Sequence, residues 1–326
     1  MRRLLLLALI VVGLAPGTLL RSPTGSRADL AVVKVTPRAD RDGVTGELAL
    51  AGAWELTSPH GWFGGFSALV PAEGAALIAG TDRGFLLDLD LSGDAPRAVP
   101  GTFRFAGIST PGRKEFVDLE SLARDPATGT LWAGFEYANL VVRFAANGTR
   151  RISAPPEMAD WSANSGPETM ERLADGRFLL IAEGPDEGSD TLHTALLYPG
   201  DPVKGGKPVV SRFAAPADYD PVDAAQLPDG RVLILLRRVR YALPAQFDTA
   251  IAIADPRMIR AGAVWQARVI ERLEGGIFAD NFEGIAYVPS AEDRARGNVW
   301  VIVDDNFSIF QRTLLVKFDW PSGGSS

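Results

Sequence analysis

The sequence contains no cysteine and only two histidines, His60 and His193, among 326 residues. Without cysteine the chain has no disulfide, no thiolate metal site, no thiol nucleophile and no lipidated N-terminal cysteine. There is also no G-x-S-x-G motif, and two histidines give no basis for a catalytic triad. A metal site would therefore depend on oxygen ligands, which favours Ca²⁺, or alternatively Mg²⁺, over zinc.

Basic residues are fewer than acidic ones, with 33 Lys and Arg against 40 Asp and Glu and a net charge of −7. No basic run follows the N-terminus, which argues against nucleic acid as a partner. Apolar residues make up 46% and charged residues 22%, as in an ordinary soluble globular protein. The 34 glycines and 23 prolines are scattered as turn residues, which favours many short strands over long helices.

Residues 1–28 have the pattern of a secretory signal peptide. Paired arginines precede the apolar run Leu4–Ala15, and small residues, Ser26 and Ala28, stand where a signal peptidase requires them. The alternative is an uncleaved membrane anchor, but this run is shorter than the roughly 18 residues that a span usually needs.

Cleavage after this segment would remove four arginines and no acids, leaving 29 basic and 40 acidic residues, a net charge of −11. We therefore expect a single acidic domain at residues 29–326, located in the periplasm or outside the cell. We expect no stable membrane span after cleavage, and a monomer.

Five apolar segments in this domain share one pattern, with a polar or acidic residue at the second position. They are Phe66–Leu69, Leu119–Leu122, Pro167–Met170, Val222–Ala225 and Phe282–Ile285. Their second positions are separated by 53, 48, 55 and 60 residues. A period near 50 fits one blade of a β-propeller, which has four short strands.

Each unit continues with a turn, a second apolar strand, a third strand and a more polar fourth strand. The second strands are Ala75–Gly80, Leu131–Phe135, Phe178–Ala182, Arg231–Leu236 and Val299–Val303. Fourth strands can be placed in four units, at Gly101–Ile108, Thr149–Ser153, Val209–Ala214 and Trp265–Leu273.

The fifth unit lacks a fourth strand, but a spare strand, Gly46–Leu56, precedes the first unit. We expect this N-terminal strand to complete the last blade and close the ring, because closure covers exposed sheet edges. The sequence thus predicts an all-β fold, a β-propeller of five blades, or of six if the long connections contain a degenerate blade. An open β-solenoid has the same period but needs polar caps.

The innermost strands of a propeller line a central channel, so equivalent positions form rings. The first strands contribute Ser67, Glu120, Glu168, Asp223 and Glu283, and the ends of the second strands contribute Asp82, Glu136, Glu183, Arg237 and Asp304. Converging carboxylates must take up protons, pair with arginines or bind a cation. We predict a Ca²⁺ site with the ligands Glu120, Glu168, Glu283, Asp304 and Asp305. The alternative is structural, with the acids capping turns and pairing with Arg83, Arg124, Arg172, Arg237 and Arg240.

Two loops, His60–Gly65 and Trp161–Gly166, lie directly before first strands and carry aromatic and polar residues. This position places them at the channel mouth, where ligands often bind. For each loop alone, ordinary packing between blades is the favoured interpretation.

Several short motifs lie between Phe63 and Phe318. They are FGGFSALV with TDRG, DLESLA with FEYANLVVRF, GPETMERLADGRFLLIAEG, LILLRR, and DNFEGIAYV with VIVDDNF and TLLVKF. As a set they resemble the bacterial "esterase-like activity of phytase", or phytase-like, proteins. The resemblance implies an exported β-propeller-like domain and phosphoester hydrolysis. This family is similar in turn to calcium-dependent β-propeller phytases, which hold metal ions and phosphate over an acidic channel.

We therefore predict an exported, Ca²⁺-dependent phosphoric-ester hydrolase that acts on a small anionic ester or another small molecule. Glu183 and Asp223 would complete the ligand set or act as general base, and Arg237 would steady the phosphate. One alternative is a non-enzymatic β-propeller that binds a component of the cell envelope. Another is a lactonase-like calcium propeller hydrolase.

Overall fold

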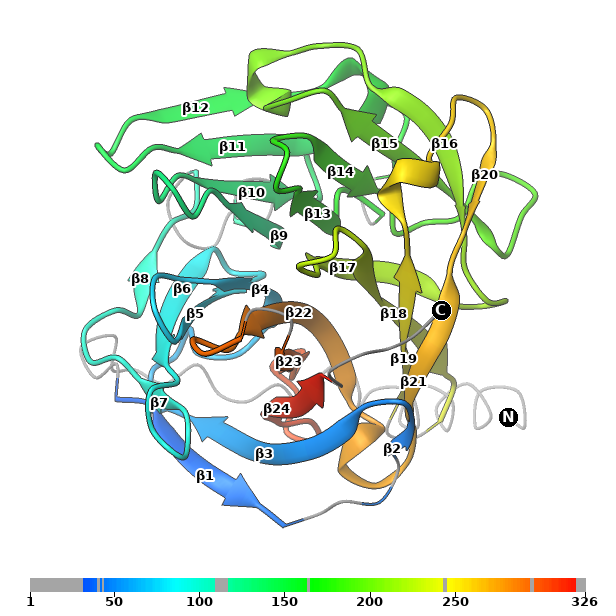
Figure 1. Cartoon of the computed structure of the whole chain (residues 1–326). Helices are drawn as coiled ribbons and strands as arrows, with labels where there is room; N and C mark the ends of the chain where they lie inside the picture. Colours follow the sequence, from blue (N-terminus) through cyan, green and yellow to red (C-terminus); the bar gives the residue numbers. More distant parts are fainter. Residues whose placement is uncertain are drawn as a thin grey trace, which may run out of the picture.

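The computed structural model describes residues 32–39, 42, 44–108, 117–162, 165–242, 245–293 and 296–320. Within these ranges the chain is almost entirely β-strand, and five sheets radiate from a central axis (Figure 1). The innermost strands contact one another in a closed circle: β4 (Phe66–Pro71), β9 (Leu119–Arg124), β13 (Thr169–Arg172), β17 (Asp220–Gln226) and β22 (Asn281–Pro289). The predicted five-bladed β-propeller is confirmed. The predicted signal peptide lies outside the described residues.

Blades 1 and 2 are consecutive antiparallel sheets. Blade 1 continues outward from β4 through β5 (Ala76–Thr81), β6 (Phe85–Asp90) and β7 (Arg97–Ala98), and β8 (Arg104–Phe105) also pairs with β6. Blade 2 continues from β9 through β10 (Leu131–Phe135), β11 (Leu140–Phe144) and β12 (Arg150–Ser153). The fourth strand predicted for the first unit is therefore wrong in part, because two short pieces on β6 replace one strand.

A strand from the connection between β19 and β21 of blade 4 joins the outer edge of blade 3. Blade 3 contains β13, β14 (Phe178–Ile181), β15 (Leu192–Tyr198) and β16 (Val209–Ala214), with β20 (Val264–Gln266) added in parallel. Blade 4 contains β17, β18 (Val232–Arg240), β19 (Gln246–Ala254), β21 (Arg268–Leu273) and β2 (Val44–Gly46). The single strand predicted at Trp265–Leu273 is thus wrong. Its first part covers the outer edge of blade 3, where it protects unpaired backbone groups.

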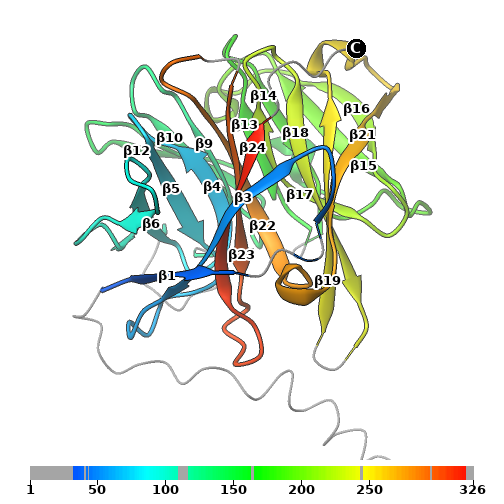
Figure 2. The same cartoon turned by 60° about the horizontal axis from the view of Figure 1, so that its bottom comes forward.

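Blade 5 is built from both ends of the described chain. It contains β22, β23 (Gly297–Asp304), β24 (Thr313–Trp320), β3 (Ala49–Thr57) and β1 (Lys34–Arg38). β3 pairs antiparallel with β24 (Figure 2). Trp54 of β3 is buried and stacks on Trp300 of β23, with ring centres 5.7 Å apart. The prediction that an N-terminal strand closes the ring is confirmed.

Within the described ranges, four short 3-10 helices lie in the connections. They are η2 (Pro156–Met158), η3 (Pro202–Lys204), η4 (Pro256–Met258) and η5 (Gly276–Phe278). Three begin with proline, whose fixed φ suits a first helical position. None of the described helices is long and apolar enough to cross a membrane.

The hydrophobic core is divided into five clusters, one between each pair of neighbouring blades. Between blades 2 and 3, for example, Trp132 packs edge-on against Phe178, with ring centres 4.9 Å apart. Because the apolar side chains of each sheet face the next sheet, they do not fill the axis. The residues at the inner ends of the strands are consequently free to be polar.

Candidate functional site

The second strand of each blade leads to a charged residue at the axis, which lies just after the strand, at its last residue or, in β18, within it. These residues are Asp82, Glu136, Glu183, Arg237 and Asp304. Asp82, Glu136 and Glu183 donate their backbone N–H to carbonyl groups that lie just before the first strand of the same blade. The acceptors are Gly65, Asp118 and Gly166, respectively. Arg237 and Asp304 occupy the same register through their pairing with Asp220 and Asn281. The register therefore makes these five positions equivalent.

β-Bulges explain why acids occur inside apolar first strands. The register shifts by one residue at Ser67, Glu120 and Glu283, so that each is an extra residue without a partner on the second strand. A bulge bends the strand and redirects a side chain, here toward the axis. Glu168 holds the matching position directly before β13.

Blade 4 differs from this pattern. Its extra residue is Val222, because Pro221 pairs with Leu236 and Asp223 already pairs with Leu235. The predicted ring alignment is therefore wrong by one residue in this blade. Sequence spacing cannot reveal where a register shifts.

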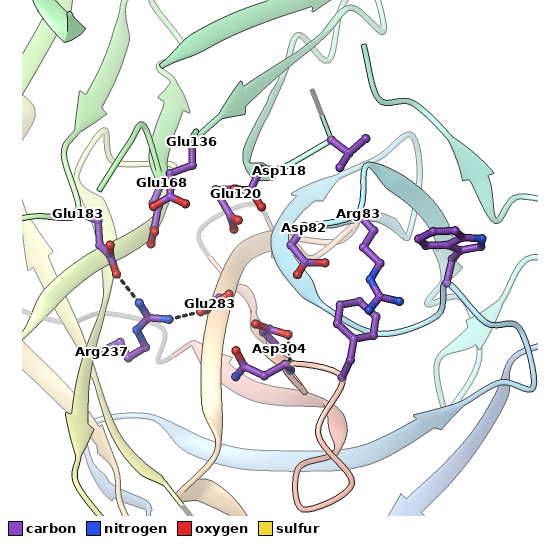
Figure 3. A pocket seen from close by; sticks show the side chains of 14 residues that line it. Asp82, Arg83, Asp118, Glu120, Glu136, Glu168, Glu183, Arg237, Glu283 and Asp304 are labelled. Carbon is purple, nitrogen blue, oxygen red and sulfur yellow. Dashed lines mark hydrogen bonds and ion pairs between the residues drawn. The ribbon is translucent and has the colours of Figure 1, made fainter. Parts of the chain in front are cut away.

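Fourteen of the described residues line a cavity of about 650 Å³ at the axis (Figure 3). Eight of them are acids: Asp82, Asp118, Glu120, Glu136, Glu168, Glu183, Glu283 and Asp304. Two are arginines, Arg83 and Arg237, so full ionisation would give −8 + 2 = −6. The remaining four are Trp62, Val117, Asn306 and Phe307.

The cavity disfavours this accumulation of negative charge. Burial raises the pKa of Glu120, Glu168 and Asp304 well above the usual range, and neighbouring carboxylates raise it further. Burial also raises the pKa of Asp82, although Arg83 opposes the shift. These groups therefore require protons or a cation to balance them.

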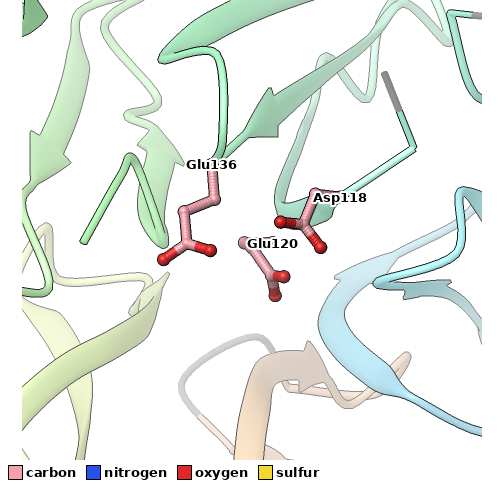
Figure 4. A group of neighbouring side chains, drawn as sticks. All are labelled: Asp118, Glu120 and Glu136. Carbon is pink, nitrogen blue, oxygen red and sulfur yellow. The ribbon is translucent and has the colours of Figure 1, made fainter. Parts of the chain in front are cut away.

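Two sets of three acids bring one oxygen each within 4.8 Å of one another. The first set is Asp118, Glu120 and Glu136 (Figure 4), and the second is Glu136, Glu168 and Glu183. Glu136 belongs to both sets.

The donors in these sets fit a divalent cation. The Glu168 side chain is only 8% exposed, and no hydrogen bond or salt bridge reaches its carboxylate from the described part of the chain. Asp82 Oδ1 is also buried without a hydrogen-bond partner among these residues. Oxygen-only donors of this kind suit Ca²⁺ or Mg²⁺ rather than zinc or copper.

Arg237 neutralises the other side of the cavity. Its guanidinium donates to Glu183 and Glu283, and its Nη1 also donates to Asn281 Oδ1 at 3.1 Å (Figure 3). Burial alone would lower the pKa of Arg237, but the surrounding acids raise it above the usual range. This arginine is therefore a fixed counter-charge between blades 3 and 5.

Six of the predicted site residues meet in this cavity. They are Glu120, Glu168, Glu183, Arg237, Glu283 and Asp304. Asp223 and Asp305 are not among the lining residues.

Asp223 joins the inner strands β17 and β22. Its carboxylate accepts hydrogen bonds from the backbone N–H groups of Ala224 and Ile285, both at 2.8 Å. Asp305 accepts from the N–H groups of Gly65 and Phe307 and from the Thr313 hydroxyl. It lines a neighbouring cavity of about 310 Å³. Both carboxylates thus organise the backbone that surrounds the axial cavity.

Several lining residues were not among the predicted ligands. Asp118 is separated from Glu120 by one residue, and alternate residues of a strand share a face, so the D-L-E spacing was an available signal. Asp82 and Glu136 belonged to the predicted second ring but not to the predicted ligand set. No sequence signal identified Phe307 as a cavity residue.

Comparison with known proteins gives a family and no curated relative. The family profile described as "Phytase-like: Esterase-like activity of phytase" matches residues 61–307, or 247 of 326 residues. No curated protein matches.

Three solved structures illustrate the similarity in fold. A virginiamycin B lyase from Staphylococcus aureus is 10% identical, with a TM-score of 0.41 and coverage of 89% of this chain and 99% of that chain. The β-propeller domain of Cps50 (Swd1) from Myceliophteria thermophila is 11% identical, with a TM-score of 0.39 and coverage of 87% and 99%. Hydrazine synthase from Kuenenia stuttgartiensis is 12% identical, with a TM-score of 0.39, and covers 73% of this chain. Only 56% of that chain is covered.

Proposed function

Since the chain belongs to the phytase-like family, with a match over residues 61–307, we propose that it is a metal-dependent phosphoric-ester hydrolase. The observation that carries this proposal is the axial cavity, whose eight acids exceed its two arginines. An anionic ester is repelled by such a cavity unless a cation lies between the two. The acids therefore suit a site in which metal and phosphate bind together.

We assign the cation, Ca²⁺ in our proposal, to the acids of blades 2 and 3. Asp118, Glu120, Glu136 and Glu168 supply oxygens there, and no arginine donates to Glu120 or Glu168 among the described residues. When bound, such a cation neutralises phosphate charge and lowers the pKa of a water molecule.

The acids of the Arg237 side have a different role. Arg237 holds Glu183 and Glu283 by ion pairs, and its charge opposes the rise in the pKa of Glu283 that burial causes. Glu183 also belongs to the second acid set, so it is the candidate general base beside the cation. Arg237 steadies the phosphate through its positive charge, and Asp304 adds a further candidate ligand.

We also propose export to the periplasm or the cell exterior, on the strength of the signal pattern in residues 1–28. The two other candidate functions give different results in the same assays. Turnover of lactones without phosphate release would indicate a lactonase-like enzyme. Retention of a cell-envelope component without any turnover would indicate a binding module.

Phosphate release from soluble esters, measured with Ca²⁺ and with EDTA, tests the proposal. We expect activity only with Ca²⁺, and its loss in Glu120→Gln and Glu168→Gln, because each removes a charged ligand. Glu73→Gln is the matched control, since Glu73 is exposed on the β4–β5 turn, and it should retain full activity. Unchanged activity in both cavity variants, with folding verified by circular dichroism, would refute the assignment.

A further inference from the structure

One side of the axial cavity is aromatic. Trp62 and Phe307 line it, and the carbon of the Arg83 guanidinium lies 3.1 Å from the ring centre of Phe307 and 5.4 Å from that of Trp62. Trp62 also stacks on Phe85, with ring centres 6.2 Å apart. The Arg83 guanidinium thus makes cation–π contacts with both aromatic side chains of the cavity.

The backbone holds Phe307 in an unusual conformation. Asn306 and Phe307 have φ angles of 48° and 50°, in the left-handed region that a bulky residue rarely adopts. The carboxylates of Asp304 and Asp305 accept their N–H groups at 2.6 and 3.0 Å, which stabilises this turn. Residues held in such conformations concentrate at ligand-binding sites.

The apolar character continues along the same loop beyond the cavity. Ile309 and Phe310, which follow Phe307 closely, are 51% and 48% exposed. Neither residue lines the axial cavity, so the apolar surface that faces a bound ligand is that of Trp62 and Phe307.

We propose that the aromatic side binds the alcohol part of the substrate, and that the substrate is a phosphate ester of an apolar, ring-bearing alcohol. This inference rests on the proposed function, since the acids and their cation must hold the phosphate. A planar ring of the substrate packs against the aromatic faces of Trp62 or Phe307 and against the Arg83 guanidinium. A highly phosphorylated polyol fits less well, because the described lining of the cavity has two arginines against eight acids, and Glu183 and Glu283 engage one of these arginines.

Calorimetric binding of two non-hydrolysable ligands tests the inference independently of turnover. With Ca²⁺ present, we expect benzylphosphonate to bind about tenfold more tightly than methylphosphonate, the effect of one stacked ring. Phe307→Asn removes the ring but keeps a residue that tolerates the left-handed conformation. In this variant, and in Trp62→Ala, the affinity ratio should fall toward one. The affinity ratio is compared because Trp62 and Phe307 also contact Arg83. If either substitution displaces Arg83, the affinity for both ligands falls alike and the ratio is unaffected.

The control is Ile152→Asn, because Ile152 is 49% exposed but lies on β12, the outer strand of blade 2. It should keep the ratio of the unmodified protein. Equal affinities in the unmodified protein, or an unchanged ratio in both aromatic variants, would overturn the inference. Phosphate release would then still support the proposed function. If the protein neither binds the phosphonates nor releases phosphate, both the proposed function and this inference are refuted.

Discussion

The two sides of the axial cavity use the same ring of positions in opposite ways. On the side of blades 2 and 3, the second strands lead to Glu136 and Glu183, and Glu120 and Glu168 lie beside them. On the side of blades 4 and 5, the equivalent position of blade 4 is Arg237, which binds acids from both of its neighbours. One basic residue in the ring thus decides which acids the protein itself neutralises.

This difference shows that repeated strands do not make a symmetric site. Arg237 is a counter-charge for Glu183 and Glu283 within the folded protein. Glu120 and Glu168 have no such ion pair among the described residues, and burial raises the pKa of both, so they require a proton or a cation from solution. A cation is therefore expected on one side only.

Removal of Arg237 should have the largest effect on stability. Arg237→Met leaves Glu183 and Glu283 buried without their counter-charge, so the free energy of unfolding should fall by about 3–5 kcal/mol. Urea denaturation at pH 8 with EDTA measures this change. Arg231→Met, which breaks the exposed pair with Asp229, should cost less than about 1 kcal/mol. Equal losses in the two variants would show that Arg237 is not the main counter-charge.

Calcium should stabilise the protein through the opposite side. At a hundredfold excess over its dissociation constant, Ca²⁺ should raise the free energy of unfolding by about 2.7 kcal/mol. Glu168→Gln should abolish this gain, while Glu283→Gln on the arginine side should keep most of it. Thermal melts with EDTA, Ca²⁺ and Mg²⁺ provide the measurement. If Glu283→Gln instead loses the whole gain, the cation lies on both sides of the cavity.

The smallest effect concerns Asp220, which stands opposite Arg237 in the strand register. Burial raises its pKa to about 6, with Glu183 adding to the shift and Arg237 opposing it. Well below about pH 4, Asp220 is protonated in both the folded and the unfolded state and contributes nothing. Between about pH 4 and 6 the unfolded chain releases this proton first, so stability should fall as pH rises.

Asp220→Asn should flatten that part of the pH profile by no more than about 1 kcal/mol, since partial exposure screens the group. Urea denaturation with EDTA at several pH values would detect the change. A steeper fall in the variant would contradict the assigned direction of the pKa shift.

The architecture could be read from the sequence because its signals are local and repeated. Apolar runs, glycine turns and a period near 50 residues specify the blades, and the unpartnered strand at Gly46–Leu56 indicates closure. The charged ring at the ends of the second strands follows from the same alignment.

The site was less accessible to sequence reasoning because it depends on register and on partner choice. The bulge of blade 4 falls at Val222, which moves Asp223 away from the cavity and into backbone hydrogen bonds. The sequence does not show which acids pair with Arg237, because its two partners, Glu183 and Glu283, are 100 residues apart in the chain. The positive φ of Phe307 likewise has no signature in a DDNF segment.

The joining of β3 to β24 also has a consequence for how the chain folds. Leu56 pairs with Thr313, a separation of 257 residues, so this contact closes a very long loop. Blades 1 to 3 can form from nearly contiguous sequence, whereas blade 5 gains its fourth strand only after the rest of the ring is present. We expect ring closure to be the last and slowest step of folding, and until then β24 exposes an edge that invites association with another chain.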